Sequence, residues 1–291
     1  MMTNRSSYSR KYGGKKLKRS NVLVWIFGMF FAVLWIAPFV WMVSTSLKPA
    51  DQVMTLHIRW IPETFTLESY RKVFEYPVIR WAFNSLFVAS FATFLGVILG
   101  AMAGYAFARL RFPGNKALFT LILVSLMIPT ELSATPLFIA FLKIGLVDNY
   151  MALILPSVAS VYSVYIFRQF FRGIPNEIEE AAIIDGASHI QIFFRIALPM
   201  AKSAVIASIV LLFTANWNLY LWPLLVTFKE EMKTLPIGIS QFSSISGSHA
   251  QLTSFGPGMA AATLLSIPSL MIFLVLQRYF VEGVTNSGIK G

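Results

Sequence analysis

The chain has 291 residues, of which 56% are hydrophobic and only 13% are charged, whereas a soluble domain carries about 25% charged residues. This composition excludes an ordinary soluble globular domain and predicts a membrane protein. Cysteine is absent, which excludes disulfides, thiolate metal sites and cysteine nucleophiles, and the three histidines lie too far apart in sequence to indicate a metal centre. The net charge of +11 would suit nucleic acid, anionic lipid or membrane orientation, and its distribution decides among them.

Six stretches of the chain are long and apolar enough to cross a membrane. Crossing the hydrocarbon core takes about 20 apolar residues, and helices satisfy all their backbone groups within one segment. The stretches lack the alternation of barrel strands, so we expect an all-α membrane protein with six transmembrane helices. The expected spans are Val22–Val43, Asn84–Ala108, Ala117–Phe141, Tyr150–Phe167, Ser203–Pro223 and Gly258–Phe280. The first span is too long for the apolar core of a signal peptide, so we expect it to be retained.

The positive charges lie on one side of this predicted bundle. The two tails and the loops after spans two and four hold 16 basic and 5 acidic residues, while the opposite loops together with Glu131 hold 8 of each. Because basic loops stay in the cytoplasm, we expect both termini there. The net charge is then an orientation signal for a protein in lipid, not the footprint of a nucleic acid. We divide the chain into a basic tail at 1–21, a transmembrane domain at 22–283 and a C-terminal tail at 284–291.

The second span has small residues at intervals of four. They are Ala92, Gly96, Gly100, Gly104 and Ala108. In lipid, such a stripe lets two helix backbones approach closely. The contact that it predicts lies either within this chain or between two chains.

The third span is interrupted by Pro129 and Pro136, which remove backbone donors and disfavour a helical conformation in the residues before them. Between them, Glu131 is the one ionisable side chain well inside a predicted span. Such a group indicates a solute pathway, but a carboxylate can also accept backbone N–H bonds where a helix restarts. Both interpretations stay open.

The fifth span ends in a cluster of polar and aromatic residues. Asn216 and Tyr220 are four residues apart, which predicts a shared helical face suited to a polar solute, and Asn218 lies between them. Trp222 fits an interfacial aromatic belt, and the asparagines could equally bond neighbouring helices. We assign Asn216, Asn218 and Tyr220 to a candidate substrate pathway with Glu131.

The loop between spans four and five predicts two short helices. Asn176 with Glu179 and Ser188 with Gln191 are typical of capping boxes, and Gly186 suits a left-handed residue between the helices. The second helix is predicted to have an apolar stripe, formed by Ile190, Phe193, Phe194 and Ala197. The first helix is acidic, so anionic lipid would repel it and a protein partner fits it better.

Seven positions in this loop, at about 175–199, match a known pattern. They are Glu180, Ala181, Ala182, Gly186, Ile196, Leu198 and Pro199. With this pattern the loop resembles the EAA loop of ABC importer permeases. Further segments are similar to carbohydrate-type permeases of the maltose, arabinose-oligomer and glycerol-3-phosphate kinds. They are Ser46–Pro49, Ala108–Gly114, Asp148–Tyr150, Phe167–Phe171, Trp217–Pro223 and Phe280–Thr285.

The resemblance implies the MetI-like bundle of an ABC type I importer permease, in the inner membrane of a prokaryote, that imports a carbohydrate. It implies that the EAA loop contacts an ATPase dimer. The residues assigned to this contact are Glu180, Ala181, Ala182, Asp185, Gly186, Ile196, Leu198 and Pro199. It also implies an ATPase contact at the tail Gly283–Gly291.

The further implied partners are a second EAA-loop permease subunit and an extracytoplasmic solute-binding protein. The binding protein is expected to dock on Ser44–Phe83 and Leu224–Pro257. The chain has no GxxxxGK[ST] phosphate loop, so we expect no cofactor and no enzymatic activity in it, and ATP with Mg²⁺ would be bound by the partner ATPase.

Other functions are less well supported by the sequence. A permease for glycerol 3-phosphate or a polyol is the nearest alternative. A proton-coupled transporter would use carboxylate or histidine relays and inverted repeats, and this chain has a single carboxylate in its spans and no evident repeat. A membrane-embedded hydrolase would need a nucleophile and a base at membrane depth, which the sequence does not indicate.

Overall fold

A computed structural model describes the backbone of residues 19–53, 59–242 and 248–287, and the side chains of 24–53, 59–242 and 255–277. All elements in these ranges are helical. They are α1 (Arg19–Ser46), α2 (Ala50–Val53), α3 (Glu68–Phe74), α4 (Val78–Arg109), α5 (Asn115–Ser125), α6 (Thr130–Lys143), α7 (Tyr150–Val158), α8 (Val161–Arg172), α9 (Asn176–Ile184), α10 (His189–Ile192), the π-helical turn η1 (Phe193–Ala197), α11 (Leu198–Met200), α12 (Lys202–Trp217), α13 (Leu221–Val226), the 3₁₀ turn η2 (Glu230–Met232), α14 (Leu235–Ser240) and α15 (Ser248–Ser287).

Four segments of the described chain are long and apolar enough to cross a membrane. They are Val24–Ser46, Val78–Arg109, Tyr150–Arg172 and Phe255–Gln277. Two further segments are helix pairs bent at a short break: α5 with α6 by 96°, and His189–Met200 with α12 by 78°. By length and composition, the described residues therefore include four helices that could cross a membrane, or up to six if each bent pair is one span. Pro129 accounts for the first bend, because α6 begins directly after it. The predicted interruption at Pro136 is wrong, since this residue lies inside α6.

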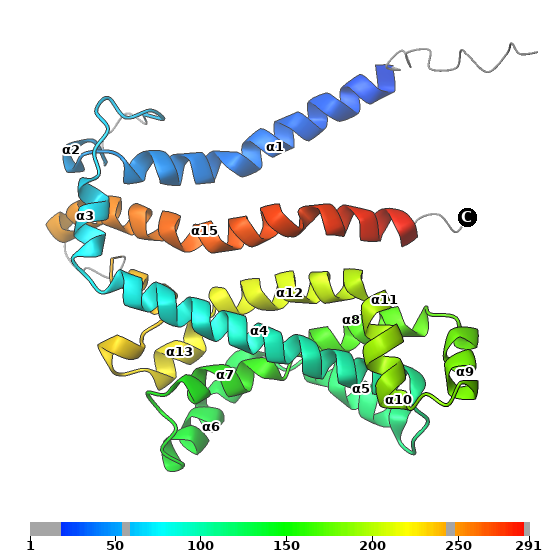
Figure 1. Ribbon diagram of the computed structural model, residues 1–291. Coiled ribbons are helices and arrows are strands. Elements are labelled where there is room, and N and C mark those ends of the chain that lie inside the picture. The colour runs from blue at the N-terminus through cyan, green and yellow to red at the C-terminus, as the bar shows by residue number, and fades with distance from the viewer. Residues whose placement is uncertain (1–18, 54–58, 243–247, 288–291) are drawn as a thin grey trace, which may run out of the picture.

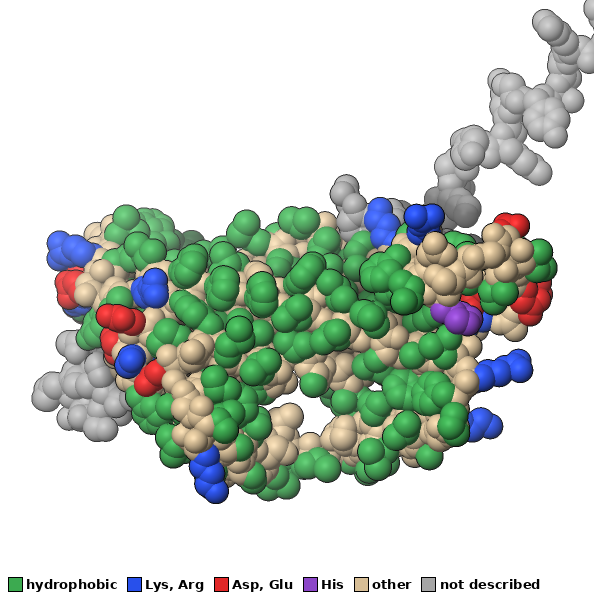
Figure 2. Space-filling model, turned by 60° about the horizontal axis from the view of Figure 1, so that its bottom comes forward, with side chains coloured by type: hydrophobic (Ala, Val, Ile, Leu, Met, Phe, Trp, Pro, Cys, Tyr) green, Lys and Arg blue, Asp and Glu red, His purple; other side chains and the backbone are tan. Residues whose placement is uncertain are grey.

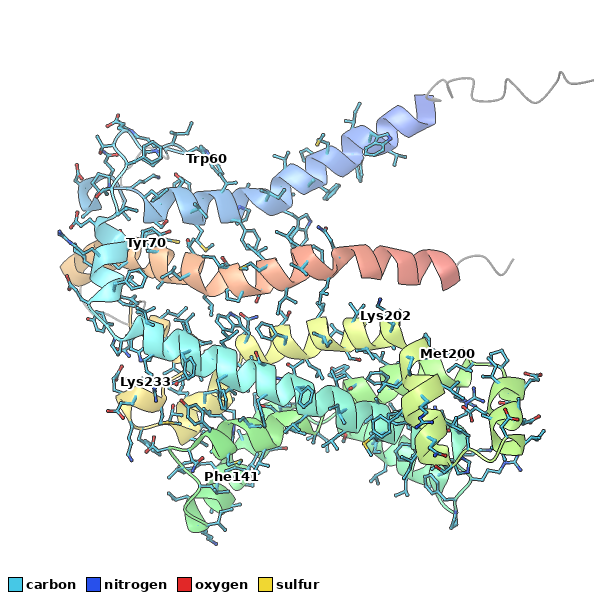
Figure 3. The ribbon with its side chains drawn as sticks, viewed as in Figure 1. Trp60, Tyr70, Phe141, Met200, Lys202 and Lys233 are labelled. Carbon is cyan, nitrogen blue, oxygen red and sulfur yellow. The ribbon has the colours of Figure 1, made fainter. Side chains whose placement is uncertain are left out.

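Helix α4 lies at the centre of the molecule and packs against α7, α8 and α12 (Figure 1). Helix α15 packs against α12, and α1 lies along α15. The start of α1, the end of α15 and the segment α9–α11 lie at one end, which we call the α9 end. Helices α2 and α3 lie at the opposite α3 end. Figure 3 shows Met200 and Lys202 towards the α9 end and Trp60, Tyr70 and Lys233 at the α3 end.

The small residues of α4 form a contact within the chain. A Cβ atom on Gly100 would lie 2.0 Å from Ser163 Oγ, and one on Gly104 would lie 2.6 Å from Phe167 Cβ. Both partners are on α8, and Ser163 Oγ donates a hydrogen bond of 3.1 Å to the Gly96 carbonyl. The alternative left open by the sequence is thus settled for α4 and α8, whose backbones touch because no side chain separates them.

The surface divides into an apolar middle and two charged ends. Figure 2 shows hydrophobic side chains across the middle of the molecule and Lys, Arg, Asp and Glu gathered at both ends. Helix α1 leaves Trp25 and Trp35 more than 70% exposed, and Met127 between α5 and α6 is 82% exposed. Such large exposed apolar areas are unsuited to water and fit contact with lipid or with another membrane chain.

Candidate coupling site

The α9 end is built on a cluster of aromatic side chains. Phe167 and Phe171 of α8 and Ile192 of α10 are fully buried. Tyr105 of α4 packs edge-on against Phe171, with ring centroids 5.6 Å apart, and lies 5.4 Å from the ring of Phe193. This cluster joins the last turns of α4 and α8 to the segment that follows α9, so the loop between the spans has a rigid base.

Helix α9 projects from this base with most of its surface in solvent. Ala182 is its one buried residue, while Ile183 is 50% and Ile184 is 85% exposed. Glu180 and Asp185 are exposed beside them, as are Ala181 and Gly186. An apolar tip surrounded by carboxylates is suited to a protein partner that covers the isoleucines and offers cations to the rim.

The turn after α9 confirms two local predictions. Gly186 has φ of +83°, the left-handed conformation expected of it, and the amide of Ala187 donates to the Ala182 carbonyl at 2.9 Å. Ser188 and Gln191 form the predicted capping box at the start of α10. The two helices are therefore separated by a short turn that local hydrogen bonds define.

The predicted capping box of Asn176 and Glu179 is wrong. Helix α9 begins after Pro175 with no side-chain cap, and both side chains instead contact Arg109. The Glu179 Oε1 atom lies 3.2 Å from Arg109 Nε, with the side chains 12% and 8% exposed. A guanidinium from the end of α4 attracts both groups more strongly than the backbone N–H groups of α9 would.

The predicted apolar stripe of the second helix is half correct. Phe193 and Ala197 are buried, but Ile190 is 72% and Phe194 is 50% exposed. The chain forms a π-helical turn at Phe193–Ala197, which adds a residue to the turn and changes the faces that follow it. Of the remaining predicted contact residues, Ile196 and Leu198 pack partly buried against the aromatic cluster, and Pro199 is exposed.

The candidate pathway residues contact different elements. Helix α12 ends at Trp217, so the prediction that Asn216 and Tyr220 share a helical face is wrong. Asn216 Nδ2 lies 3.5 Å from Thr93 Oγ1 on α4, Asn218 Nδ2 lies 3.5 Å from Ser269 Oγ on α15, and the Tyr220 hydroxyl lies 3.5 Å from Ser240 Oγ on α14. Glu131 is exposed in the first turn of α6, and the structure gives it no cap hydrogen bond.

The α3 end is held by the three consecutive residues Asp148, Asn149 and Tyr150. Asp148 Oδ1 accepts from the amides of Phe228 and Lys229 at 2.6 and 2.9 Å, and Asn149 caps α7.

The Tyr150 hydroxyl donates to Asn84 Oδ1 at 2.7 Å. The same asparagine donates to the carbonyls of Glu231 and Lys233, at 2.7 and 2.8 Å. The segment Asp148–Tyr150 is one of those that are similar to carbohydrate-type permeases. Its residues fix the loops at this end of the molecule, which gives the similarity a structural cause.

Lys48 fixes the first of the two predicted docking loops. Its side chain is 2% exposed, Nζ donates to the Arg59 carbonyl at 2.6 Å, and the ammonium lies 4.3 Å from the Trp41 ring centroid. Burial lowers the pKa of Lys48 from its ordinary value. Parts of both docking loops, at 54–58 and 243–247, lie outside the described residues, as do 288–291 of the predicted ATPase-binding tail.

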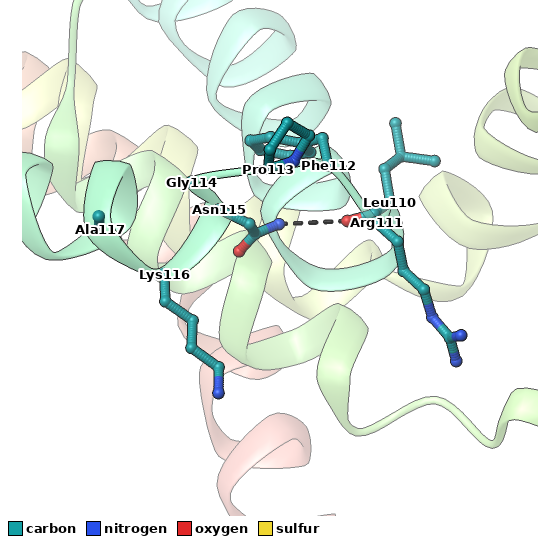
Figure 4. A pocket seen from close by; sticks show the side chains of 8 residues that line it. All are labelled: Leu110, Arg111, Phe112, Pro113, Gly114, Asn115, Lys116 and Ala117. Carbon is teal, nitrogen blue, oxygen red and sulfur yellow. Dashed lines mark hydrogen bonds between the residues drawn. The ribbon is translucent and has the colours of Figure 1, made fainter.

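A shallow depression of about 730 Å³ lies beside the α9 end, in the loop between α4 and α5. Asn115 Nδ2 donates to the Leu110 carbonyl at 3.1 Å and closes this turn, while the Arg111 and Lys116 side chains extend in a similar direction with their charged ends apart (Figure 4). The two cations do not converge on one point, so the depression is not built to hold a single anion. Among the residues with described side chains, no three His, Asp or Glu residues are placed to hold a metal ion.

Comparison with known proteins identifies a family. The family described as "Binding-protein-dependent transport system inner membrane component" matches residues 92–286. The arabinooligosaccharides transport system permease protein AraQ of Bacillus subtilis is 34% identical over 275 residues, which cover 93% of this chain and 96% of AraQ. The sn-glycerol-3-phosphate transport system permease protein UgpE of Yersinia pestis is 39% identical over 202 residues, which cover 69% of this chain and 71% of UgpE.

The fold is also found in a solved structure. One chain of a bacterial ABC transporter involved in the import of the acidic polysaccharide alginate superimposes with a TM-score of 0.78 and 22% sequence identity. The match covers 90% of this chain and 98% of that chain. The predicted bundle of an ABC importer permease is confirmed at the level of the fold.

Proposed function

Because the chain belongs to the family of binding-protein-dependent transport system inner membrane components, we propose that it is a permease subunit that imports a carbohydrate with energy from a partner ATPase. The projecting helix α9 is the observation that supports this most directly. It presents Ile183, Ile184 and the exposed residues Glu180 and Asp185 at one end of the bundle, where a cytoplasmic subunit could cover them. ATP and Mg²⁺ would belong to that subunit.

We propose that the α9 end is cytoplasmic and that the chain crosses the inner membrane six times, with each bent helix pair as one span. The basic tail 1–21 and the loop with Arg109, Arg111 and Lys116 support this orientation, since basic segments remain in the cytoplasm. In this orientation α3 and the loops held by Asn84 face the extracytoplasmic binding protein. The exposed apolar areas of α1 and of the α5–α6 arm would then face lipid and the second permease subunit.

The substrate is proposed to be a neutral mono- or oligosaccharide. AraQ is by its name an arabinooligosaccharide permease, and this chain is similar to it over nearly its whole length. Glu131, Asn216, Asn218 and Tyr220 would contribute polar contacts to the pathway. Glycerol 3-phosphate is the second candidate, supported by the similarity to UgpE.

Purification from the native membrane in mild detergent tests the assembly. We expect a stoichiometric ATPase with a phosphate loop and a second permease with an EAA loop to remain bound. The complex reconstituted into proteoliposomes with ATP inside and the binding protein outside should accumulate an arabinose oligomer and exclude glycerol 3-phosphate. Accumulation of glycerol 3-phosphate alone would select the second candidate, and a homo-oligomer without any ATPase would contradict the importer.

A further inference from the structure

Arg109 is the last residue of α4, and its guanidinium reaches across to the segment that holds α9. Nη2 donates to the Phe171 carbonyl at 2.5 Å and to the Ile174 carbonyl, and Nη1 donates to Asn176 Oδ1. Nε faces Glu179 Oε1 at 3.2 Å. One side chain thus contacts the end of α8, the connecting turn and the first turn of α9. We call this set of contacts the Arg109 junction.

The chemistry of the junction requires arginine. The guanidinium is planar and presents five N–H donors in a fixed geometry, whereas a lysine ammonium is a single point of charge. The Arg109 and Glu179 side chains are 8% and 12% exposed, so removal of either would leave a nearly buried charge without its partner. The contacts therefore fix the direction of α9 relative to α4.

Apart from the Arg109 junction, α9 has only a small apolar contact with the described part of the chain. Its one buried residue is Ala182, whose methyl group contributes far less stabilisation than a buried Leu or Phe side chain would. Ile183 and Ile184 point into solvent. The apolar anchor of α9 is therefore small: Ala182 is buried, and Ile178 packs partly buried against the aromatic cluster.

We propose that Arg109 is a positioning residue that makes α9 and the end of α4 move as one unit when the ATPase displaces α9. This inference rests on the proposed function, in which α9 receives the movement of the ATPase. Without the junction the ATPase would still bind the exposed tip and hydrolyse ATP. The displacement of α9 would then no longer be passed to the transmembrane helices.

The first test compares Arg109→Ala with Arg111→Ala in the reconstituted transporter. Arg111 is exposed in the same loop and serves as the matched control. We expect Arg109→Ala to assemble and to retain ATP hydrolysis, while solute transported per ATP falls about tenfold, within the usual range of coupling between two sites. Arg111→Ala should keep the wild-type ratio. A wild-type ratio in Arg109→Ala, with or without a lower yield of complex, would overturn the proposal.

The second test restores the junction covalently. The chain has no cysteine, so the pair Arg109→Cys and Glu179→Cys can be joined by a short bifunctional thiol reagent. We expect the unlinked double variant to be uncoupled and the linked one to regain transport per ATP, whereas Glu179→Cys alone should not respond to the reagent. Failure of the linked variant to recover would contradict the proposal. If the wild-type complex itself does not use ATP for uptake, the proposed function fails instead.

Discussion

Gly186 and Gly145 adopt the same unusual backbone conformation at opposite ends of the molecule. Their φ angles are +83° and +70°, and a Cβ atom on either would meet nothing within 4 Å in this chain. A substitution at either residue therefore costs backbone strain without a steric clash. Gly186 lies in the turn after α9, whereas Gly145 lies between α6 and α7.

We expect Gly186→Val to abolish uptake while membrane insertion remains normal. A β-branched residue in the left-handed conformation costs roughly 1–2 kcal/mol, so the turn after α9 would change its direction. Uptake by proteoliposomes and the amount of inserted chain measure the two effects. Gly145→Val is the matched control, with the same strain far from α9, and should transport normally. Normal uptake by Gly186→Val would remove this turn from the coupling contact.

Glu131 is expected to contribute to solute recognition from the first turn of α6. A carboxylate accepts stronger hydrogen bonds from hydroxyl groups than an amide does, so Glu131→Gln should raise the KM for uptake about fivefold and leave ATP hydrolysis unchanged. Lys143→Gln, at the other end of the same helix, is the control and should keep the wild-type KM. An unchanged KM in Glu131→Gln would exclude a role in the pathway.

Predictions from the sequence succeeded for residues whose partners are close in sequence. Ser188 and Gln191 form the expected cap because each satisfies a backbone group three residues away. Asn176 and Glu179 have the same spacing, but Arg109 lies close to them in space and competes for both side chains. In the sequence, Arg109 counted only as one of the basic residues of its loop and as part of a segment similar to known permeases. A basic residue directly after a long apolar span, opposite an acidic helix, is the signal that could have indicated its role.

At the scale of elements, the contact between α4 and α8 depends on the absence of side chains. Ser163 Oγ occupies the space in which a Cβ atom of Gly100 would lie, and Phe167 occupies that of Gly104. The four-residue spacing of small residues predicted a close contact. Its partner could not be predicted, because the spacing describes only one of the two surfaces.

Gly100→Ala should destabilise the protein by about 1–3 kcal/mol, the usual cost of overpacking, because the new methyl group would push α8 away from α4. The thermal midpoint of the purified chain in detergent measures this loss. Gly28→Ala in α1, where nothing lies within 4 Å of the added Cβ, should leave the midpoint unchanged or raise it slightly. Equal midpoints for the two variants would contradict the close contact.

The apolar stretches of the sequence predicted the long apolar helices and one interruption among them, but not the others. Span three was predicted to be interrupted because proline disfavours helix locally, and α5 and α6 meet there at 96°. No such signal precedes the end of α12 at Trp217, and no composition distinguishes a π-helical turn at Phe193–Ala197 from an α-helix. Both depend on packing against helices that are distant in sequence.

At the scale of the whole molecule, charge and apolar surface are arranged for a membrane and for partners. The charged side chains gather at two ends, and the apolar middle between them is exposed along α1 and the α5–α6 arm. The distribution of charged and apolar residues along the sequence predicted this division. It did not predict how little of α1 is covered, because that depends on which helices pack against α1.

The source of energy distinguishes the importer from a proton-coupled carrier. In vesicles of the native membrane we expect depletion of ATP to abolish uptake, since the chain has no evident proton relay. A protonophore applied while ATP is maintained should leave uptake intact. Loss of uptake with the protonophore alone would contradict the importer and make Glu131 the residue to study.

The length of α4 has a mechanical consequence. Its 32 residues, at 1.5 Å each, make a rod about 48 Å long. Arg109 is at one tip, Asn84 bonds the loop at 231–233 near the other, and Gly100 fixes the rod against α8 between them. A rigid rod that turns about a contact along its length moves its two ends in opposite directions, so we expect a displacement of the Arg109 end to move the Asn84 end the opposite way. In the orientation proposed above, one rotation of α4 would then link the two membrane surfaces.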